Sequence, residues 1–267
     1  MSAGTKISVR GVSKLFRTAG GEEVLALDRT DLEIRNGEFV SIVGPSGCGK
    51  STLLNLIAGF EQPTDGRVEV DGRRIERPGA DRGVVFQNYA LFPWLSVAQN
   101  IAFGPRSIGC TPREVRERVA RCISLVKLDG FDAKYPHELS GGMSQRCALA
   151  RCIANDPDVM LMDEPLAALD AFTRETLQDE LLRIWSEASH QRSKTVVYVT
   201  HAIDEALFLS DRVVVMQPRP GRVLDIVDVP FARPRAGEMR LQPDFHALQA
   251  KVWRLLNQKT EEEQRRQ

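Results

Sequence analysis

Lys50 and Ser51 end a glycine-rich run that could hold the phosphates of a nucleotide. Residues 44–51 fit the pattern G-x-x-x-x-G-K-[ST], between an apolar run at 38–43 and a helical pattern at 52–58. In such a loop the backbone N–H groups and the helix N-terminus attract anions, and the lysine reaches the outer phosphates. An ordinary glycine-rich turn rarely carries Lys-Ser at this point. The residues expected to contact the nucleotide here are Gly44, Pro45, Ser46, Gly47, Cys48, Gly49, Lys50, Ser51 and Thr52.

Further polar residues each follow an apolar run that is typical of a buried strand. Gln87 follows residues 83–86, Asp163 and Glu164 follow 159–162, and His201 follows 195–200. In an open parallel sheet, ligands bind outside the carboxyl ends of the strands. The sequence therefore predicts that these side chains share the sheet edge that carries the glycine-rich loop.

The chemistry of these groups suggests a role for each one. Ser51 and Asp163 suit the binding of Mg²⁺ and its waters, and Gln87 could touch the metal or orient a water. Glu164 could polarise a water behind the γ-phosphate, and His201 could hydrogen-bond that phosphate. The catalytic residues predicted are thus Lys50, Gln87, Glu164 and His201. The alternatives are a solvated loop carboxylate for Glu164 and a helix N-cap for His201.

A second anion site is predicted where Ser140, Gly141 and Gly142 precede the helical pattern of residues 147–154. A serine and two glycines leave free N–H groups at a helix start. One chain with one phosphate loop has little need of a second site for the same nucleotide. A dimer in which each chain closes the other's nucleotide would use both sites.

These features together resemble the ATP-binding cassette of ABC transporters, over about residues 5–230. Residues 139–145 are similar to its signature motif, with Met143 where glutamine is commoner, and residues 168–170 resemble its D-loop. The resemblance adds Ser140, Gly141, Gly142, Gln145 and Asp170 to the nucleotide-binding residues. It also matches Phe16 to the aromatic residue that stacks on adenine, although a tyrosine is more usual and a short insertion (18–23) follows. The alternative for Phe16 is a core aromatic residue on a strand.

The resemblance implies an α/β fold: a P-loop NTPase cassette with a mainly parallel core sheet, an N-terminal antiparallel β region and an inserted helical lobe. We expect one domain over residues 1–267. Its nucleotide-binding core would span about 5–90 and 159–230, and the lobe with the signature motif about 91–158. Residues 231–267 would form a short C-terminal helix and a charged tail, disordered from Lys259 onward. Thr111, Pro112 and Glu114 predict a capped helix start inside the lobe.

Composition excludes several classes of protein. Lys plus Arg and Asp plus Glu each number 36, so no basic surplus indicates nucleic-acid binding. No apolar run reaches membrane-spanning length, and the first residues do not resemble a signal peptide. The five cysteines include no C-x-x-C pair, which favours reduced thiols. Together with this composition, the resemblance implies a peripheral protein on the cytoplasmic face of the plasma (inner) membrane that needs a separate membrane subunit.

Finer features resemble the import ATPases for nitrate, sulfonate and taurine. They are residues 88–95, the signature variant and residues 218–222. The resemblance implies an ATP-hydrolysing subunit that forms a homodimer with ATP and Mg²⁺ and drives import through a membrane permease served by an extracytoplasmic binding protein. An exporter, or an importer of another small solute, is the alternative. Tyr89, Phe92 and Trp94 could dock a permease helix, or could simply pack inside the lobe.

Overall fold

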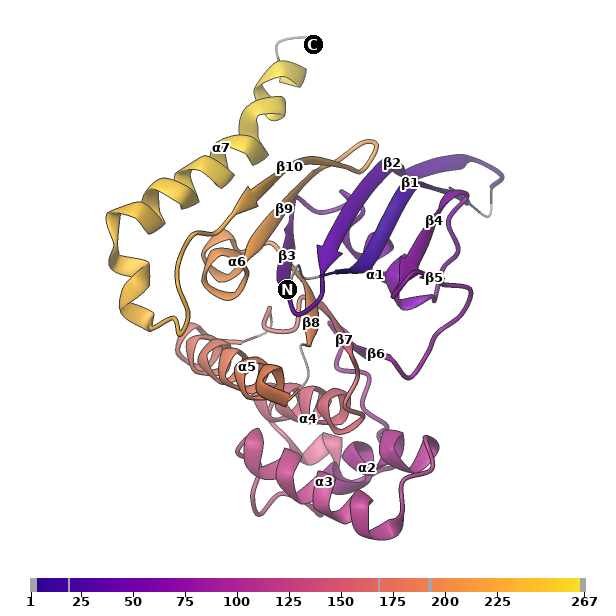
Figure 1. Ribbon diagram of the computed structural model, residues 1–267, viewed down its shortest axis with the longest axis vertical. Coiled ribbons are helices and arrows are strands. Elements are labelled where there is room, and N and C mark those ends of the chain that lie inside the picture. The colour runs from indigo at the N-terminus through magenta and orange to yellow at the C-terminus, as the bar shows by residue number, and fades with distance from the viewer. Residues whose placement is uncertain (1–3, 19, 168, 192–193, 265–267) are drawn as a thin grey trace. The chain divides into compact units, whose positions relative to one another are not determined.

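The computed structural model describes residues 4–18, 20–167, 169–191 and 194–264. The chain divides into two compact units, and each is described by itself. Unit 1 contains Met1–Pro78 and Thr195–Gln267, and unit 2 contains Gly79–Lys194. Figure 1 labels the helices and strands of both units. Among the described residues, no helix combines the length and the apolarity that crossing a membrane requires.

An antiparallel sheet forms the first part of unit 1, as the resemblance implied. Its strands lie in the order β2-β1-β4-β5, with β1 at Thr5–Arg17, β2 at Glu23–Arg35, β4 at Asp65–Val70 and β5 at Arg73–Arg74. Near its end β2 alternates between buried and exposed residues, which is the pattern of a sheet with one face on the core. The insertion predicted at 18–23 begins directly after β1 and ends at Glu23, the first residue of β2.

Mainly parallel strands form the other sheet of unit 1. Strand β3 (Phe39–Val43) pairs in parallel with β8 (Thr195–Thr200) on one side and with β9 (Arg212–Gln217) on the other. Strand β10 (Arg222–Asp228) pairs antiparallel with β9. Every residue of β3 and β8 is buried, as expected for strands covered on both faces. Helices α1 (Lys50–Ala58) and α6 (Ile203–Leu209) pack against these strands.

Unit 2 joins two parallel strands to a helical lobe. Strand β6 (Arg82–Val85) pairs with β7 (Val159–Asp163), and the helices are α2 (Val97–Ser107), α3 (Pro112–Leu125), α4 (Gly141–Ala154) and α5 (Ala171–Gln191). A short 3₁₀ turn, η1, spans Pro136–Glu138. Buried residues of α2, α3 and α4 form one apolar cluster that includes Ile101, Cys122 and Cys147. The capping box predicted at Thr111 and Glu114 is present, with Pro112 opening the helix. The lobe expected over 91–158 lies within unit 2.

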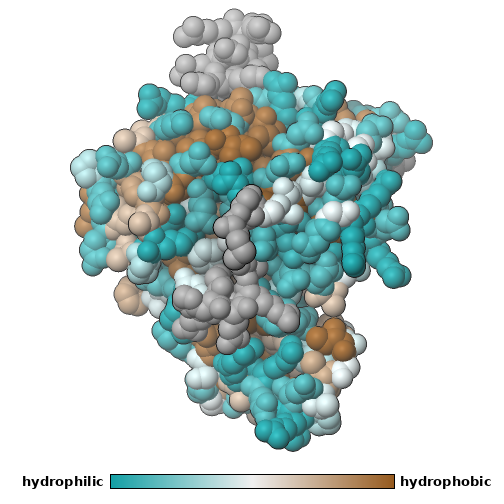
Figure 2. All heavy atoms as spheres, in the orientation of Figure 1, coloured by the Kyte–Doolittle hydropathy of each residue, from teal (hydrophilic) through white to brown (hydrophobic). Residues whose placement is uncertain are grey.

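The C-terminal helix differs from the expectation. After η2 (Gly237–Leu241), helix α7 runs from Pro243 to Gln264, so the prediction of a short helix was wrong. The prediction of disorder from Lys259 onward was also wrong as far as Gln264. Lysine, glutamate and glutamine favour helix even where no apolar stripe requires it. Phe245 and Val252 anchor the first part of α7 in unit 1. Figure 2 shows an apolar area over β10, within a mostly hydrophilic face.

Candidate functional site

The glycine-rich loop between β3 and α1 has a backbone that only glycine fits. Gly47 and Gly49 have positive φ angles of 77° and 87°. A Cβ on Gly49 would lie 2.6 Å from Leu27 Cδ2, and a Cβ on Gly44 would lie 2.5 Å from Cys48 Sγ. The loop is therefore fixed by conformation and by close packing at once.

Lys50 is the first residue of α1, and its side chain folds back over the loop. It is only 7% exposed, and its Nζ donates hydrogen bonds to the carbonyl oxygens of Gly44 (2.8 Å) and Pro45 (3.2 Å). The N-cap residue Gly49 makes no side-chain hydrogen bond, so the first N–H groups of α1 are not capped by it. Ser51 is exposed on the first turn. A charged ammonium and a helix N-terminus therefore meet at one point, which suits a bound phosphate.

Cys48 is a buried residue of this loop. It is 1% exposed, and its Sγ lies 3.9 Å from Lys50 Nζ. Burial raises the pKa of the Cys48 thiol, and the nearby Lys50 charge opposes that effect only in part. The thiol is thus neutral at pH 7 and acts as a small apolar side chain.

Phe16 lies on β1 and is 36% exposed, so its interpretation as a core aromatic residue was wrong. The Nζ of Lys14 lies 4.8 Å from the centre of the Phe16 ring, and Phe16 pairs across the sheet with Val24. A ring held this way can offer a face to a planar ligand. Stacking on adenine remains a prediction.

His201 is exposed directly after β8, and the N-cap of α6 is Ala202, so the N-cap alternative for His201 was wrong. The Thr200 hydroxyl donates to Glu205 Oε2 at 2.5 Å and accepts from the Ala202 N–H at 3.1 Å. This hydroxyl therefore bridges the turn that contains His201. Glu205 is 4% exposed, and sequence reasoning missed it; a glutamate in the first turn of a predicted helix was the available signal.

In unit 2 the structure brings Gln87 and Glu164 together. Gln87 Nε2 donates to Glu164 Oε2 at 3.4 Å, and Asp163 is the last residue of β7. Glu164 is half-buried, which does not fit a freely solvated loop carboxylate. Its φ angle is 45°, a left-handed conformation that costs a non-glycine residue about 1–3 kcal/mol. Backbone strain of this kind is typical of residues in active sites and ligand-binding sites.

The segment after Glu164 is tied down by Arg174 of α5. The Arg174 guanidinium donates to the carbonyl oxygens of Leu166 (3.3 Å) and Leu169 (2.8 Å). Asp170 accepts a hydrogen bond from the Thr173 N–H at 3.0 Å, and this bond lowers the pKa of the Asp170 carboxyl. Residue 168 of the predicted D-loop lies outside the described residues. Sequence reasoning missed Arg174, although an arginine four residues after Asp170 at a helix start was visible.

The predicted helix start at Ser140 is confirmed. Ser140 is the N-cap of α4, and its Oγ accepts from the Met143 N–H at 3.3 Å. Gly141 and Gly142 form the first turn, and a Cβ on Gly142 would lie 3.4 Å from Leu169 Cδ2. The signature residues and the D-loop are therefore neighbours inside unit 2.

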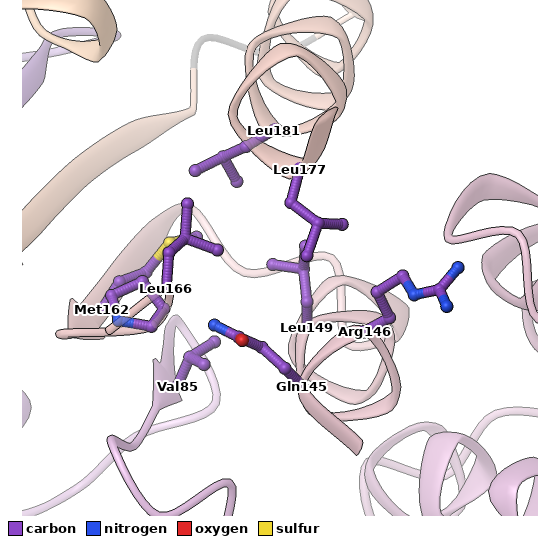
Figure 3. A pocket seen from close by; sticks show the side chains of 9 residues that line it. Val85, Gln145, Arg146, Leu149, Met162, Leu166, Leu177 and Leu181 are labelled. Carbon is purple, nitrogen blue, oxygen red and sulfur yellow. The ribbon is translucent and has the colours of Figure 1, made fainter. Parts of the chain in front are cut away.

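Gln145 lies one turn further along α4, and its side chain is not presented to solvent. It is 2% exposed and points toward Val85 and Leu166, as Figure 3 shows. That it contacts the nucleotide remains a prediction, and its place in the core indicates another role.

An arginine that sequence reasoning missed orders the segment after Gln87. Arg151 of α4 donates to the carbonyl oxygens of Ala90 (2.7 Å) and Tyr89 (3.1 Å), and its guanidinium lies 5.4 Å from the centre of the Phe92 ring. Burial lowers the pKa of Arg151. Trp94 lies beside Phe92, with ring centres 5.7 Å apart, and is 70% exposed.

The expected site residues thus fall into two sets. Unit 1 carries Phe16, the glycine-rich loop with Lys50, and His201. Unit 2 carries the Gln87–Glu164 pair, Asp163, and the signature residues beside the D-loop.

Comparison with known proteins gives a consistent result. The family model for the ABC transporter matches residues 27–167. The chain is 51% identical to an uncharacterised ABC transporter ATP-binding protein of Methanocaldococcus jannaschii, over 86% of this chain and 84% of the relative. It is 49% identical to the taurine import ATP-binding protein of Jannaschia sp., over 85% and 84%.

Solved structures agree with this result. A dimeric ATP-binding cassette in a post-hydrolysis state, bound to ADP and phosphate, is 34% identical and matches with a TM-score of 0.74. The match covers 85% of this chain and all of that one. A second dimeric structure, of a bacterial ABC transporter cassette, gives a TM-score of 0.75 at the same identity and coverage. The chain therefore belongs to the ABC transporter family, as an ATP-binding subunit with that family's ATPase cassette.

Proposed function

We propose that Lys50 and Glu164 act on the same ATP molecule, with Mg²⁺ between the phosphates and the protein. Lys50 would neutralise the β- and γ-phosphates, and Ser51 would bind the metal. Asp163 would hold the waters of the metal, which carboxylate oxygens suit. The observation that carries this proposal is the buried, charged Lys50 at an uncapped helix start.

Glu164 would polarise the attacking water, and Gln87 and His201 would orient the water and the γ-phosphate. The contact between Gln87 and Glu164 supports this assignment, because it holds the carboxylate beside a group that can also contact the metal. The Thr200–Glu205 pair would keep His201 in place. Phe16 would stack on the adenine ring.

A homodimer would complete each site, with Ser140, Gly141 and Gly142 of one chain facing the nucleotide of the other. The Ser140 side chain caps the Met143 N–H, which leaves the N–H groups of Gly141 and Gly142 at the helix start for a γ-phosphate. The two similar solved cassettes described above are dimers, which supports the proposal. Asp170, beside the signature residues, would lie at the same interface.

We further propose that Phe92 and Trp94 form the docking surface for a membrane permease, at the cytoplasmic face of the membrane. The Phe92 ring packs against Phe103 (ring centres 4.6 Å apart) and is covered by Arg151, so it belongs partly to the lobe. Trp94, by contrast, is mostly exposed and has a large apolar face free for a partner.

Replacement of Trp94 tests this docking surface. Trp94→Ser should lower the yield of the permease complex at least about tenfold and leave the melting temperature of the cassette unchanged, because an exposed anchor contributes to binding more than to folding. The measurement is co-purification with the permease. Trp253→Ser, at a tryptophan of α7 that is 58% exposed, is the matched control. Unfolding of the Trp94 variant would favour packing inside the lobe.

For the transported substrate we propose a small anion of the nitrate, sulfonate or taurine kind, moving inward. Relatives 46–49% identical over most of their length are named taurine import ATP-binding proteins, which supports this choice. The test is ATP-dependent uptake of labelled taurine, an alkanesulfonate and nitrate by the complex with its permease and binding protein. Uptake of one of them supports the proposal. Outward movement would show an exporter instead.

A further inference from the structure

Gln145 is a buried amide that lacks a hydrogen-bond partner. Its Nε2 and Oε1 atoms are both inaccessible to solvent, and neither has a partner among the described residues. Its side chain points into a small pocket of unit 2 between α4, α5, β6 and the loop after β7 (Figure 3). The lining residues are Val85, Gln145, Arg146, Leu149, Met162, Pro165, Leu166, Leu177 and Leu181.

Apart from Arg146, the side chains that line the pocket around the Gln145 amide are apolar. Arg146 turns away and donates instead to the carbonyl oxygens of Val126 (3.3 Å) and Lys127 (3.1 Å). The cavity volume is about 10 Å³, enough for the centre of one water molecule. Among the described residues the only other polar side chain of the lining is that of Arg146, which turns away, so a water there would have one polar side-chain partner, whereas buried waters need two to four. The amide is therefore unsatisfied in this conformation and destabilises it.

Gln145 lies between the signature residues of α4 and the loop that follows Glu164. It lies on α4, one turn beyond the signature residues that Ser140 caps. The pocket that its side chain enters is also lined by Pro165 and Leu166, the two residues that follow Glu164. Pro165 has no N–H, and the Leu166 carbonyl already accepts from Leu169 and Arg174. These two main-chain positions therefore do not serve the Gln145 amide in this conformation.

We propose that Gln145 is a positioning residue for the catalytic loop. When the cassette closes on ATP, the amide takes its hydrogen-bond partners from the main chain of the loop after Glu164. These hydrogen bonds stabilise the closed conformation relative to the conformation of this structure. They also couple α4, which begins with the signature residues, to the position of the Glu164 carboxylate. This inference rests on the proposed role of Glu164 in ATP hydrolysis.

Gln145→Met tests the inference, because methionine has nearly the shape of glutamine and no amide. In the full-length chain the melting temperature should rise by about 2–4 °C, since an unsatisfied polar group has been removed. The kcat for ATP should fall about tenfold or more, with KM changed less than about twofold, because placement and not ATP binding is lost. Leu149→Met, in the same pocket one turn along α4, is the control and should leave kcat unchanged.

The outcomes separate the inference from the proposed function. A Gln145→Met protein that melts lower would show that the amide is already satisfied, and would overturn the inference. So would a variant that melts higher but hydrolyses ATP at the wild-type rate, while the proposed function would stand. Failure of the wild-type chain itself to hydrolyse ATP would overturn the proposed function and the inference together, whereas the melting temperatures would still report on the buried amide.

Discussion

The two loops that carry the predicted catalytic and binding residues differ in backbone strain and in hydrogen bonding. In unit 1, the loop at residues 44–49 has glycine at its left-handed positions, and its lysine is hydrogen-bonded to the loop's own carbonyl oxygens. In unit 2, the loop at 163–170 holds a glutamate in a left-handed conformation and faces an unsatisfied glutamine. The backbone of the first loop is therefore unstrained in this conformation, and that of the second loop is strained.

This difference is consistent with phosphate binding by the first loop and catalysis by the second. A phosphate cradle works best when it is rigid and preformed, because nothing then has to be ordered on binding. A catalytic carboxylate can gain from strain, because a stressed loop moves readily between arrangements. We therefore expect substitutions in the first loop to remove binding and hydrolysis together, and substitutions around the second to lower hydrolysis alone.

The largest effect should come from Lys50→Ala. Removal of the charge aimed at the phosphates should lower ATP hydrolysis at least about a hundredfold and also weaken ATP binding. Steady-state hydrolysis and nucleotide titration measure the two effects. Lys251→Ala, at an exposed lysine of α7, is the control. Near-native turnover by the Lys50 variant would contradict the phosphate-binding assignment.

A smaller effect, in the second loop only, should come from Arg174→Ala. Loss of the guanidinium removes its hydrogen bonds to the carbonyl oxygens of Leu166 and Leu169, so the loop is less well ordered. The kcat should therefore fall about tenfold while the affinity for ATP is kept. The neighbouring exposed Glu175→Ala should change neither quantity. If Arg174→Ala weakened ATP binding as much as Lys50→Ala, the contrast between the two loops would be lost.

Features set by neighbouring residues were predictable from the sequence. The capping box at Thr111 and Glu114 and the helix start at Ser140 depend on residues close along the chain, and the structure confirms both. Residues that act across long sequence separations were not predictable. Arg151 bonds carbonyl oxygens about sixty residues away, and no periodicity reports such a contact.

The sequence also could not distinguish roles that depend on burial. Gln145 looked like the rest of the signature motif, but its position on the inner side of α4 places it in the core. For Phe16 the alternative was a core position, which its exposure excludes. For His201 the alternative was a helix N-cap, which is excluded because Ala202 is the N-cap of α6. The extent of α7 was misjudged because a charged composition was taken for disorder, although the same residues favour helix.

The central claim is that ATP is bound between the Lys50 loop of one chain and the Ser140 helix start of another, and is cleaved by Glu164. Glu164→Gln keeps the shape of the side chain but removes the base, so ATP should bind and persist, and the dimer should be trapped. Sizing the full-length protein with ATP and Mg²⁺ is the direct measurement. We predict a dimer for Glu164→Gln and a monomer once Ser140→Arg is added, because the long side chain blocks closure. A dimer that Ser140→Arg leaves intact would contradict the account.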